Sequence, residues 1–202
     1  NAPVFTSSAS FSADENQTSI ASVTASDADD SSLSFSVSGS ELLISDGGIL
    51  SFASPPDYET KSSFSATVTA SDGDLSATQA ITVNVNNLND NAPVFTSSAS
   101  FSADENQTSI NTVTATDADD SSLSFTISGS ELLINNDGIL TFATTPDYET
   151  KSSYTATITV SDGVASAAQN ITVSINNLND NAPVFTSSAS FSAAENQTAI
   201  GT

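Results

Sequence analysis

Carboxylates recur in short motifs along this chain, and their types and spacing could do chemistry. The 202 residues carry 24 Asp and Glu against 2 Lys and Arg, with no His and no Cys. The usual general base, zinc ligand and thiol nucleophile are therefore all missing. Ser and Thr hydroxyls abound but have no base to activate them, so the chain is not expected to be an enzyme. Paired carboxylates could in principle serve glycoside hydrolysis.

A hard cation matches these carboxylates better. In the second half of the chain, seven acids lie near the ends of predicted strands: Glu105, Asp117, Asp119, Asp147, Glu149, Asp162 and Asp180. Packed carboxylates repel one another and lose hydration, so such clustering needs a reason. Calcium supplies one, because it takes about six to eight oxygen ligands with relaxed geometry. Calcium is the predicted ligand, and for any single motif the alternative is an acidic turn.

The elements that must position these acids are periodic. The segment at 1–5 recurs at 91–95 and again at 181–185, so the period is 90 residues without insertion or deletion. Most differences between the first two copies are mild exchanges such as Phe64 for Tyr154. We therefore predict two complete repeats and a fragment, at 1–90, 91–180 and 181–202.

Within each copy, short apolar alternations predict strands and no helix. In the second copy the first strand is broken in two, at Val94-Phe95 and near Phe101. The later strands are expected at 110–116, 123–127, 132–134, 139–142, 154–160 and 171–175, with a turn at Asp137-Gly138. The sequence therefore predicts an all-β fold of tandem seven-stranded Greek-key β-sandwiches, immunoglobulin-like in size.

Five motifs together resemble the cadherin repeat. They are Glu15-Asn16, Pro56-Asp57-Tyr58-Glu59, Asn89-Asp90-Asn91-Ala92-Pro93, Asp117-Ala118-Asp119 and Ser161-Asp162-Gly163. Each motif alone is weakly specific, but the set occurs in the family's order, twice over, and covers essentially the whole chain. The resemblance implies cadherin-type sandwiches arranged end to end, with about three calcium ions (Ca2+) at each complete junction between repeats.

The resemblance also implies a ligand set for each junction. At the first junction it implies Glu15, Asp57, Glu59, Leu88 and Asn91 (through their backbone carbonyls), Asn89, Asp90, Asp117, Asp119 and Asp162. At the second it implies Glu105, Asp147, Glu149, Leu178, Asn179, Asp180 and Asn181. The third copy stops before its own Asp-x-Asp segment, so the outermost ion there is expected to be weak or absent. At the front, Asp27, Asp29 and Asp72 lack a preceding linker.

The sequence departs from the family pattern at three places. Pro56-Asp57-Tyr58-Glu59 replaces Leu-Asp-Arg-Glu but keeps both carboxylates. Asn87 stands where the linker often has an Asp, which leaves its role open. The loop at 120–122 is shorter than in many relatives, so the backbone carbonyl that completes the outermost ion cannot be placed.

The formal charge of −22 disfavours nucleic acid and anionic membranes as partners, because there is almost nothing basic to neutralise phosphates. No apolar run approaches membrane-spanning length, so direct membrane insertion of this segment is not expected. Near-absence of Lys and Arg, with no Cys, His, Met or Trp, is typical of a bacterial surface protein from a salty habitat.

These features predict an extracellular, cell-surface segment of an adhesin that serves as a calcium-rigidified spacer or rod in cell adhesion. The predicted partners are calcium and the neighbouring repeats of the same chain. Two alternatives stay open: the repeats themselves bind like repeats on other chains or glycans, or the chains pack side by side as a surface filament or sheath. Vertebrate cadherins that associate by swapping strands use an N-terminal Trp. This chain has no Trp, so that mode is not expected, and other contacts between like repeats stay open.

Overall fold

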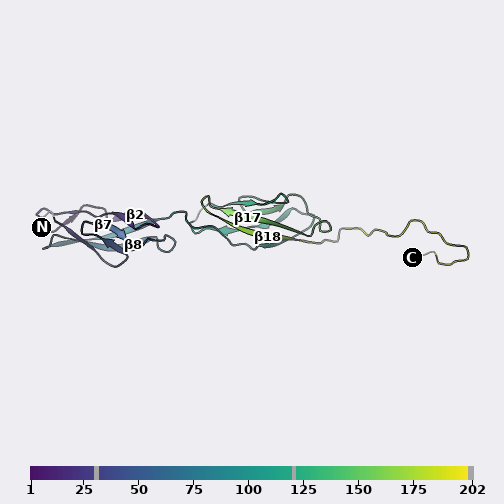
Figure 1. Ribbon diagram of the computed structural model, residues 1–202, viewed down its shortest axis with the longest axis horizontal. Helices are drawn as coiled ribbons and strands as arrows, with labels where there is room; N and C mark the ends of the chain where they lie inside the picture. Colours follow the sequence, from purple (N-terminus) through teal and green to yellow (C-terminus); the bar gives the residue numbers. More distant parts are fainter. Residues whose placement is uncertain (30–31, 120–121, 200–202) are drawn as a thin grey trace.

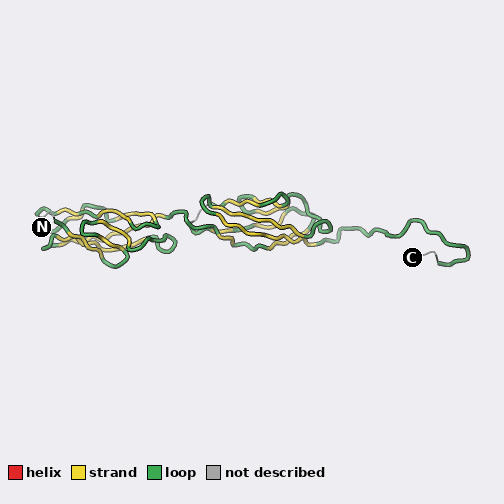
Figure 2. The backbone as a smooth tube through the Cα atoms, in the orientation of Figure 1, coloured by secondary structure: helices red, strands yellow, loops and turns green. Residues whose placement is uncertain are grey.

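The computed structural model describes residues 1–29, 32–119 and 122–199, and all regular structure in them is β-strand. Two β-sandwiches follow one another along the long axis of the molecule, and the C-terminal residues extend beyond the second sandwich (Figure 1). Strands run along both sandwiches, while the linker and the C-terminal segment are irregular (Figure 2). The predicted all-β fold of tandem sandwiches is confirmed. No helix of the described residues is long and apolar enough to span a membrane.

The same set of strands forms both sandwiches. In the first they are β1 (Val4–Phe5), β2 (Ser10–Asp14), β3 (Ser19–Ser22), β4 (Ala25–Ser26), β5 (Ser34–Val37), β6 (Leu42–Ile44), β7 (Ile49–Phe52), β8 (Ser63–Ser71) and β9 (Ser76–Asn86). In the second they are β10 (Val94–Phe95), β11 (Ser100–Asp104), β12 (Ser109–Thr112), β13 (Ala115–Thr116), β14 (Ser124–Ile127), β15 (Leu132–Ile134), β16 (Ile139–Phe142), β17 (Ser153–Ser161) and β18 (Ser166–Asn176).

Each sandwich has a four-stranded sheet facing a three-stranded sheet. In the first sandwich their orders are β2-β9-β8-β5 and β3-β7-β6, and a short β1-β4 pair completes one end. All pairings are antiparallel except that of β2 with β9. Alternation along β8 and β9 turns Phe64, Val68, Ile81 and Val83 into the core and leaves Ser and Thr on the outer face. Because β2 ends beside the end of β9, the residue after β2 lies at the start of the linker.

The predicted strand over 110–116 is wrong in one respect, because the structure breaks it into β12 and β13. The break occurs where the chain leaves its partner β16 and pairs instead with β10. At the break, Val113 N donates to Gly138 O at 2.8 Å. Gly138 has a φ of 76°, and a Cβ there would lie 2.1 Å from Val113 O. The predicted turn therefore needs its glycine for a close approach. The predicted break in the first strand, into β10 and β11, is confirmed.

The third copy forms no strand over residues 181–199. Val184 and Phe185 are 84% and 94% exposed, although the equivalent Val94 and Phe95 form β10. In the second sandwich β10 pairs with β13, at Ala115 and Thr116. The sequence ends before the third copy reaches the residues that would supply this pairing.

Candidate metal centre at the junction between repeats

A buried glutamate holds the start of the linker. Glu15 directly follows β2 and is only 2% exposed. Its Oε1 accepts a hydrogen bond from Leu88 N at 2.7 Å, and its Oε2 accepts one from Tyr58 N at 2.8 Å. The carboxylate is thereby fixed between the linker and the loop before β8, because both of its oxygens are engaged by backbone amides.

Two exposed acids of that loop lie beside Glu15. Asp57 Oδ2 accepts a hydrogen bond from Thr60 Oγ1 at 3.0 Å, and Asp57 Oδ1 accepts one from Glu59 N at 3.1 Å. The hydrogen bonds from Thr60, and then those from Glu59, hold the pKa of Asp57 below its ordinary value, so Asp57 is ionised at neutral pH. Carboxylate oxygens of Glu15, Asp57 and Glu59 all lie within 4.8 Å of one another.

A second cluster of acidic residues contains members from both repeats and from the linker. Oxygens of Glu59, Asp90 and Asp119 lie within 4.8 Å of one another, and these residues come from repeat 1, the linker and repeat 2. Asp119 Oδ2 accepts hydrogen bonds from Asp90 N at 2.9 Å and Asn91 N at 2.7 Å, and its Oδ1 accepts one from Asn91 Nδ2 at 3.0 Å. Asn87 Nδ2 donates to Asp119 O at 3.4 Å, which gives that linker position a contact with the next repeat.

The pKa values of two carboxyl groups at this junction are shifted in opposite directions. Loss of hydration raises the pKa of Glu59, and the neighbouring Asp119 and Glu15 raise it further. The side-chain amide of Asn91 lowers the pKa of Asp119. No lysine relieves the crowding, since the two lysines of the sequence are paired elsewhere, Lys61 with Glu41 at 2.5 Å and Lys151 with Glu131 at 2.6 Å.

Three predicted ligands of this junction carry a buried oxygen without a hydrogen-bond partner: Asn89 Oδ1, Asp117 Oδ2 and Asp162 Oδ2. The other oxygen of each carboxylate is engaged. Asp117 Oδ1 accepts from Asp119 N at 2.9 Å, and Asp162 Oδ1 accepts from Ala165 N at 2.6 Å. A buried oxygen without a partner costs free energy, and a cation that accepts oxygen ligands would remove that cost. The donor set is all oxygen, so these residues fit calcium.

Calcium binding through the backbone carbonyls of the linker residues Leu88 and Asn91 stays a prediction. Leu88 O accepts a hydrogen bond from Asp90 N at 3.1 Å, and Leu88 N is held by Glu15. At Asn91 the structure shows amide donors directed at Asp119. The loop at 120–122, where a further carbonyl could not be placed from the sequence, begins in residues outside those that the structure describes.

The end of repeat 2 reproduces half of this arrangement. Oxygens of Glu105, Asp147 and Glu149 lie within 4.8 Å of one another, and Glu105 is 2% exposed. Glu105 accepts from Leu178 N at 2.7 Å and from Tyr148 N at 2.9 Å. The hydrogen bonds from Thr150 hold the pKa of Asp147 below its ordinary value, as Thr60 does for Asp57. The remaining predicted ligands, Asn179, Asp180 and Asn181, are exposed. Asp180 accepts hydrogen bonds from Asn106 and Asn181, and none of the described hydrogen bonds joins these ligands to a residue beyond Asn181.

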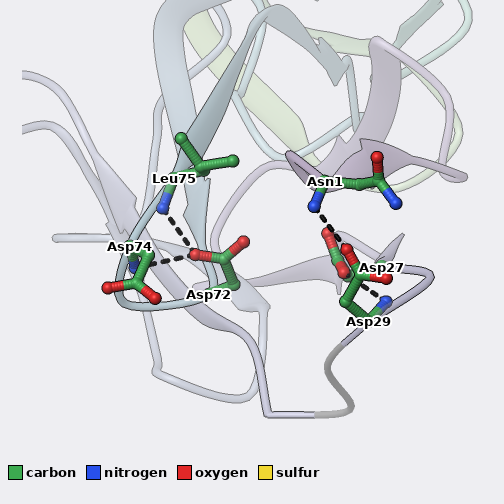
Figure 3. Close-up of polar contacts among 6 residues, drawn as sticks. All are labelled: Asn1, Asp27, Asp29, Asp72, Asp74 and Leu75. Carbon is green, nitrogen blue, oxygen red and sulfur yellow. Dashed lines mark hydrogen bonds and ion pairs between the residues drawn. The ribbon is translucent and has the colours of Figure 1, made fainter.

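The front of repeat 1 shows the complementary half. Asp27 and Asp72 lie on neighbouring loops, with Asp29 beside Asp27 (Figure 3). Asp72 Oδ1 accepts from Leu75 N at 2.6 Å and from Asp74 N at 2.8 Å, and these bonds lower the pKa of Asp72. Asp29 N donates to Asp27 Oδ1 at 2.7 Å. Each described repeat therefore presents the same acid-bearing turns at its N-terminal end.

Sequence reasoning missed one participant. Asn16 Nδ2 donates to Asp90 Oδ2, and Asn106 Nδ2 donates to Asp180 Oδ2 at 2.6 Å. The signal was present, because an Asn follows the motif glutamate in every copy, but it was not assigned a role.

Tandem all-β sandwiches with acids gathered at the linker define a cadherin-like repeat protein, as the sequence predicted. The chain belongs to the bacterial Ig domain family, whose pattern it matches over residues 1–86 and 89–175.

Curated relatives and solved structures agree with this class. The chain is 32% identical over 160 residues to mouse "Cadherin EGF LAG seven-pass G-type receptor 2", covering 70% of this chain and 5% of that protein. It is 33% identical over 151 residues to human Protocadherin-23, covering 68% and 4%. The chain thus spans about a twentieth of these relatives.

Among solved structures, mouse Cadherin-23 EC22-24 superimposes with a TM-score of 0.77 at 22% identity, over 89% of this chain and 68% of that chain. Human Protocadherin-24 EC1-2 gives 0.75 at 22% identity, over 88% and 99%. At this level of identity, the likeness establishes the fold.

Proposed function

We propose that this chain is a calcium-rigidified segment of tandem repeats, 1–90, 91–180 and the start of a third at 181–202, that acts as a spacer in an extracellular adhesin. The observation that carries the proposal is the set of buried oxygens without a hydrogen-bond partner on Asn89, Asp117 and Asp162. Carboxylates of both repeats, Glu59 and Asp119, also meet at the linker residue Asp90. The cadherin names of the curated relatives support an adhesive, non-enzymatic role at a cell surface.

The residues of the first junction would act together. Bound calcium, about three ions by the family pattern, supplies positive charge among carboxylates that otherwise repel. Glu15 keeps the linker against repeat 1, and Asp119 keeps it against repeat 2. A linker of a few residues between sandwiches normally permits bending. Carboxylates from both sides of the linker that share ions would remove this freedom and turn the chain into a rod.

Thermal melting with and without calcium tests the proposal. A ligand that binds only the folded form stabilises it by mass action, and extracellular calcium modules have dissociation constants of roughly 10⁻⁴–10⁻³ M. We expect about 10 mM calcium to add roughly 1–3 kcal/mol per occupied site, to raise the melting temperature, and to be reversed by a chelator. Magnesium at the same concentration is the control. A melt that calcium leaves unchanged would refute the proposal.

A second candidate function is binding by the repeats themselves. The outer face of the four-stranded sheet carries Ser and Thr and has a hollow of about 380 Å³ beside Ser65, Ala66 and Thr67. The equivalent face of repeat 2 has a hollow of about 440 Å³ beside Thr155 and Thr157. No charged residue among those described lines either hollow, so a glycan or a like repeat could approach this acidic chain there. Sedimentation with and without calcium separates the candidates: a monomer that only elongates is a spacer, whereas calcium-dependent association favours binding.

A further inference from the structure

Three asparagines of the described residues, Asn16, Asn106 and Asn196, adopt a left-handed backbone conformation that non-glycine residues rarely adopt. Asn16 and Asn106 each have a φ of 64° and each directly follows a buried glutamate. Asn16 N donates to Pro56 O at 3.0 Å, and Asn106 N donates to Pro146 O at 2.9 Å. Asn is among the residues that best tolerate this left-handed region, because its short polar side chain can bond locally. The same local turn is therefore built at the end of both repeats.

The side chains of these asparagines reach the linker that follows their own repeat. Asn16 Nδ2 donates to Asp90 Oδ2, and Asn106 Nδ2 donates to Asp180 Oδ2 at 2.6 Å. The second contact forms although residues 181–199 contain no strand. It therefore belongs to a repeat and its own linker and does not depend on a folded neighbour.

The contacts toward the following repeat behave differently. At the first junction the amide N–H groups of Asp90 and Asn91 donate to Asp119 of repeat 2. At the second linker, Asn177 Nδ2 instead donates back to Glu149 of its own repeat at 3.2 Å. The linker thus keeps its hold on the preceding repeat when the hold on the following one is missing.

We propose that Asn16 and Asn106 are positioning residues that hold the linker carboxylate against the preceding repeat before any ion or neighbouring repeat engages it. The proposal rests on the calcium function proposed above and assigns it a preorganising step. Glu15 holds the linker at Leu88, and Asn16 holds it at Asp90. In the calcium-free protein, a linker held at both residues can bend only beyond Asp90. Part of the conformational entropy that the linker must lose is then lost on folding, so less of it opposes calcium binding.

The test is Asn16→Gly in the 202-residue chain. Glycine adopts this backbone conformation without strain and removes the whole side chain, including the amide that donates to Asp90. Without calcium, we expect faster motion of the Asp90 amide by ¹⁵N relaxation and a melting temperature close to that of the unsubstituted chain. With calcium, losing one hydrogen bond to a carboxylate should weaken binding at this junction roughly ten-fold by calorimetry. The matched control is Asn106→Gly. It should mobilise the Asp180 amide and leave the calcium affinity of the first junction within about two-fold of that of the unsubstituted chain.

Exchanging the donor and the acceptor between positions 16 and 90 tests whether their hydrogen bond, and not the shape of the Asn16 side chain, holds the linker. Asn16→Asp sets a carboxylate against Asp90 and should loosen the linker in chelator. Adding Asp90→Asn restores a donor opposite an acceptor, so the double variant should recover the slow relaxation of the amide at position 90 in chelator. Failure to recover it, or unchanged relaxation in Asn16→Gly, overturns the tether.

Calcium binding provides an independent outcome. A loosened linker with unaltered affinity overturns the claim that tethering assists binding. If the unsubstituted chain binds no calcium, the function proposed above fails, while the relaxation measurements in chelator still decide the tether.

Discussion

The junction between the two sandwiches and the open end of repeat 2 share one half of a site and differ in the other. Both have a buried glutamate that engages two backbone amides, and both have an acid triplet within 4.8 Å. Among the described residues, an acid from the following repeat is bonded to the linker at the first junction alone, where Asp119 accepts from Asp90 N and Asn91 N. One repeat therefore assembles its own half of the site, and the other half requires the N-terminal turns of a neighbour.

This division explains which ligand oxygens have hydrogen-bond partners and which have none. In the half that each repeat builds alone, backbone amides and Thr60 or Thr150 already engage the carboxylates. In the half supplied by the neighbour, Asp117 and Asp162 each keep a buried oxygen without a partner, and so does Asn89 of the linker between the repeats. We infer that the first half is set by folding of one repeat and that the second half gains most from an ion.

The largest expected effect is conversion of the open end into a closed junction. The third copy at 181–202 aligns with 91–112, so appending a copy of 113–180 would complete it. The added Asp-x-Asp segment and late Asp should bond to the linker at Asp180 as Asp119 does at Asp90. Calorimetry should then detect two equivalent sets of calcium sites. An unchanged stoichiometry would show that the two ends differ for another reason.

The next largest effect is expected from the buried glutamate. Glu15→Ala and Glu105→Ala each leave two backbone amides without their acceptor, at about 1–3 kcal/mol per unsatisfied group when it stays buried. We expect each to lower the free energy of unfolding of its own repeat by roughly 2–4 kcal/mol in chelator, measured with urea.

The chain supplies its own control for this substitution. Glu195 occupies the same position in the third copy, where it is exposed. Glu195→Ala should leave the unfolding curve unchanged. Equal curves for Glu15→Ala and Glu195→Ala would contradict the structural role assigned to the buried carboxylate.

A smaller and more selective effect is expected at Asp119. Asp119→Asn keeps the shape of the side chain but removes one negative charge from the group that joins the repeats. Because calcium affinity depends on the number of charged ligands, we expect roughly ten-fold weaker binding at the first junction. Asp29→Asn is the matched change at the front of repeat 1, where the terminal amine of Asn1 contacts Asp29 at 2.5 Å. It should leave the affinity of the first junction unaltered; equal losses in both variants would argue against a junction-specific role.

The fold could be predicted largely from sequence, because period-two alternation and the 90-residue repeat fix the strands and their order along the chain. The break at Val113 was not predicted, since it arises when one strand changes partners, and partner choice is not written in local alternation. The clustering of Glu15, Asp57 and Glu59 followed from motifs of a known family. The role of Asn16 did not, because its contact spans 74 residues and depends on a left-handed backbone that only the structure shows.

The smallest expected effect is at the linker asparagines. Asn91 Nδ2 donates to Asp119 Oδ1 at 3.0 Å and to Asp90 Oδ1 at 3.1 Å, whereas Asn181 Nδ2 donates to Asp180 Oδ1 at 3.0 Å. The Asn91 bond lowers the pKa of Asp119, so Asn91→Ala should raise that pKa toward its ordinary value of 3.8.

The sign of the resulting pH dependence follows from linkage. A carboxyl group with a lowered pKa stabilises the docked junction above its ordinary pKa and loses that contribution as the pH falls through the lowered value. In chelator, Asn91→Ala should therefore weaken docking at neutral pH and leave it unaltered under acid conditions, where Asp119 is protonated in both chains. NMR titration of Asp119 measures the pKa, and spin labels on the two sandwiches measure docking. Asn181→Ala should change neither, because no described residue of a following repeat accepts from Asn181. If both alanine variants gave the same result, the two linkers would be equivalent and the contrast between closed and open ends would not reside in this amide.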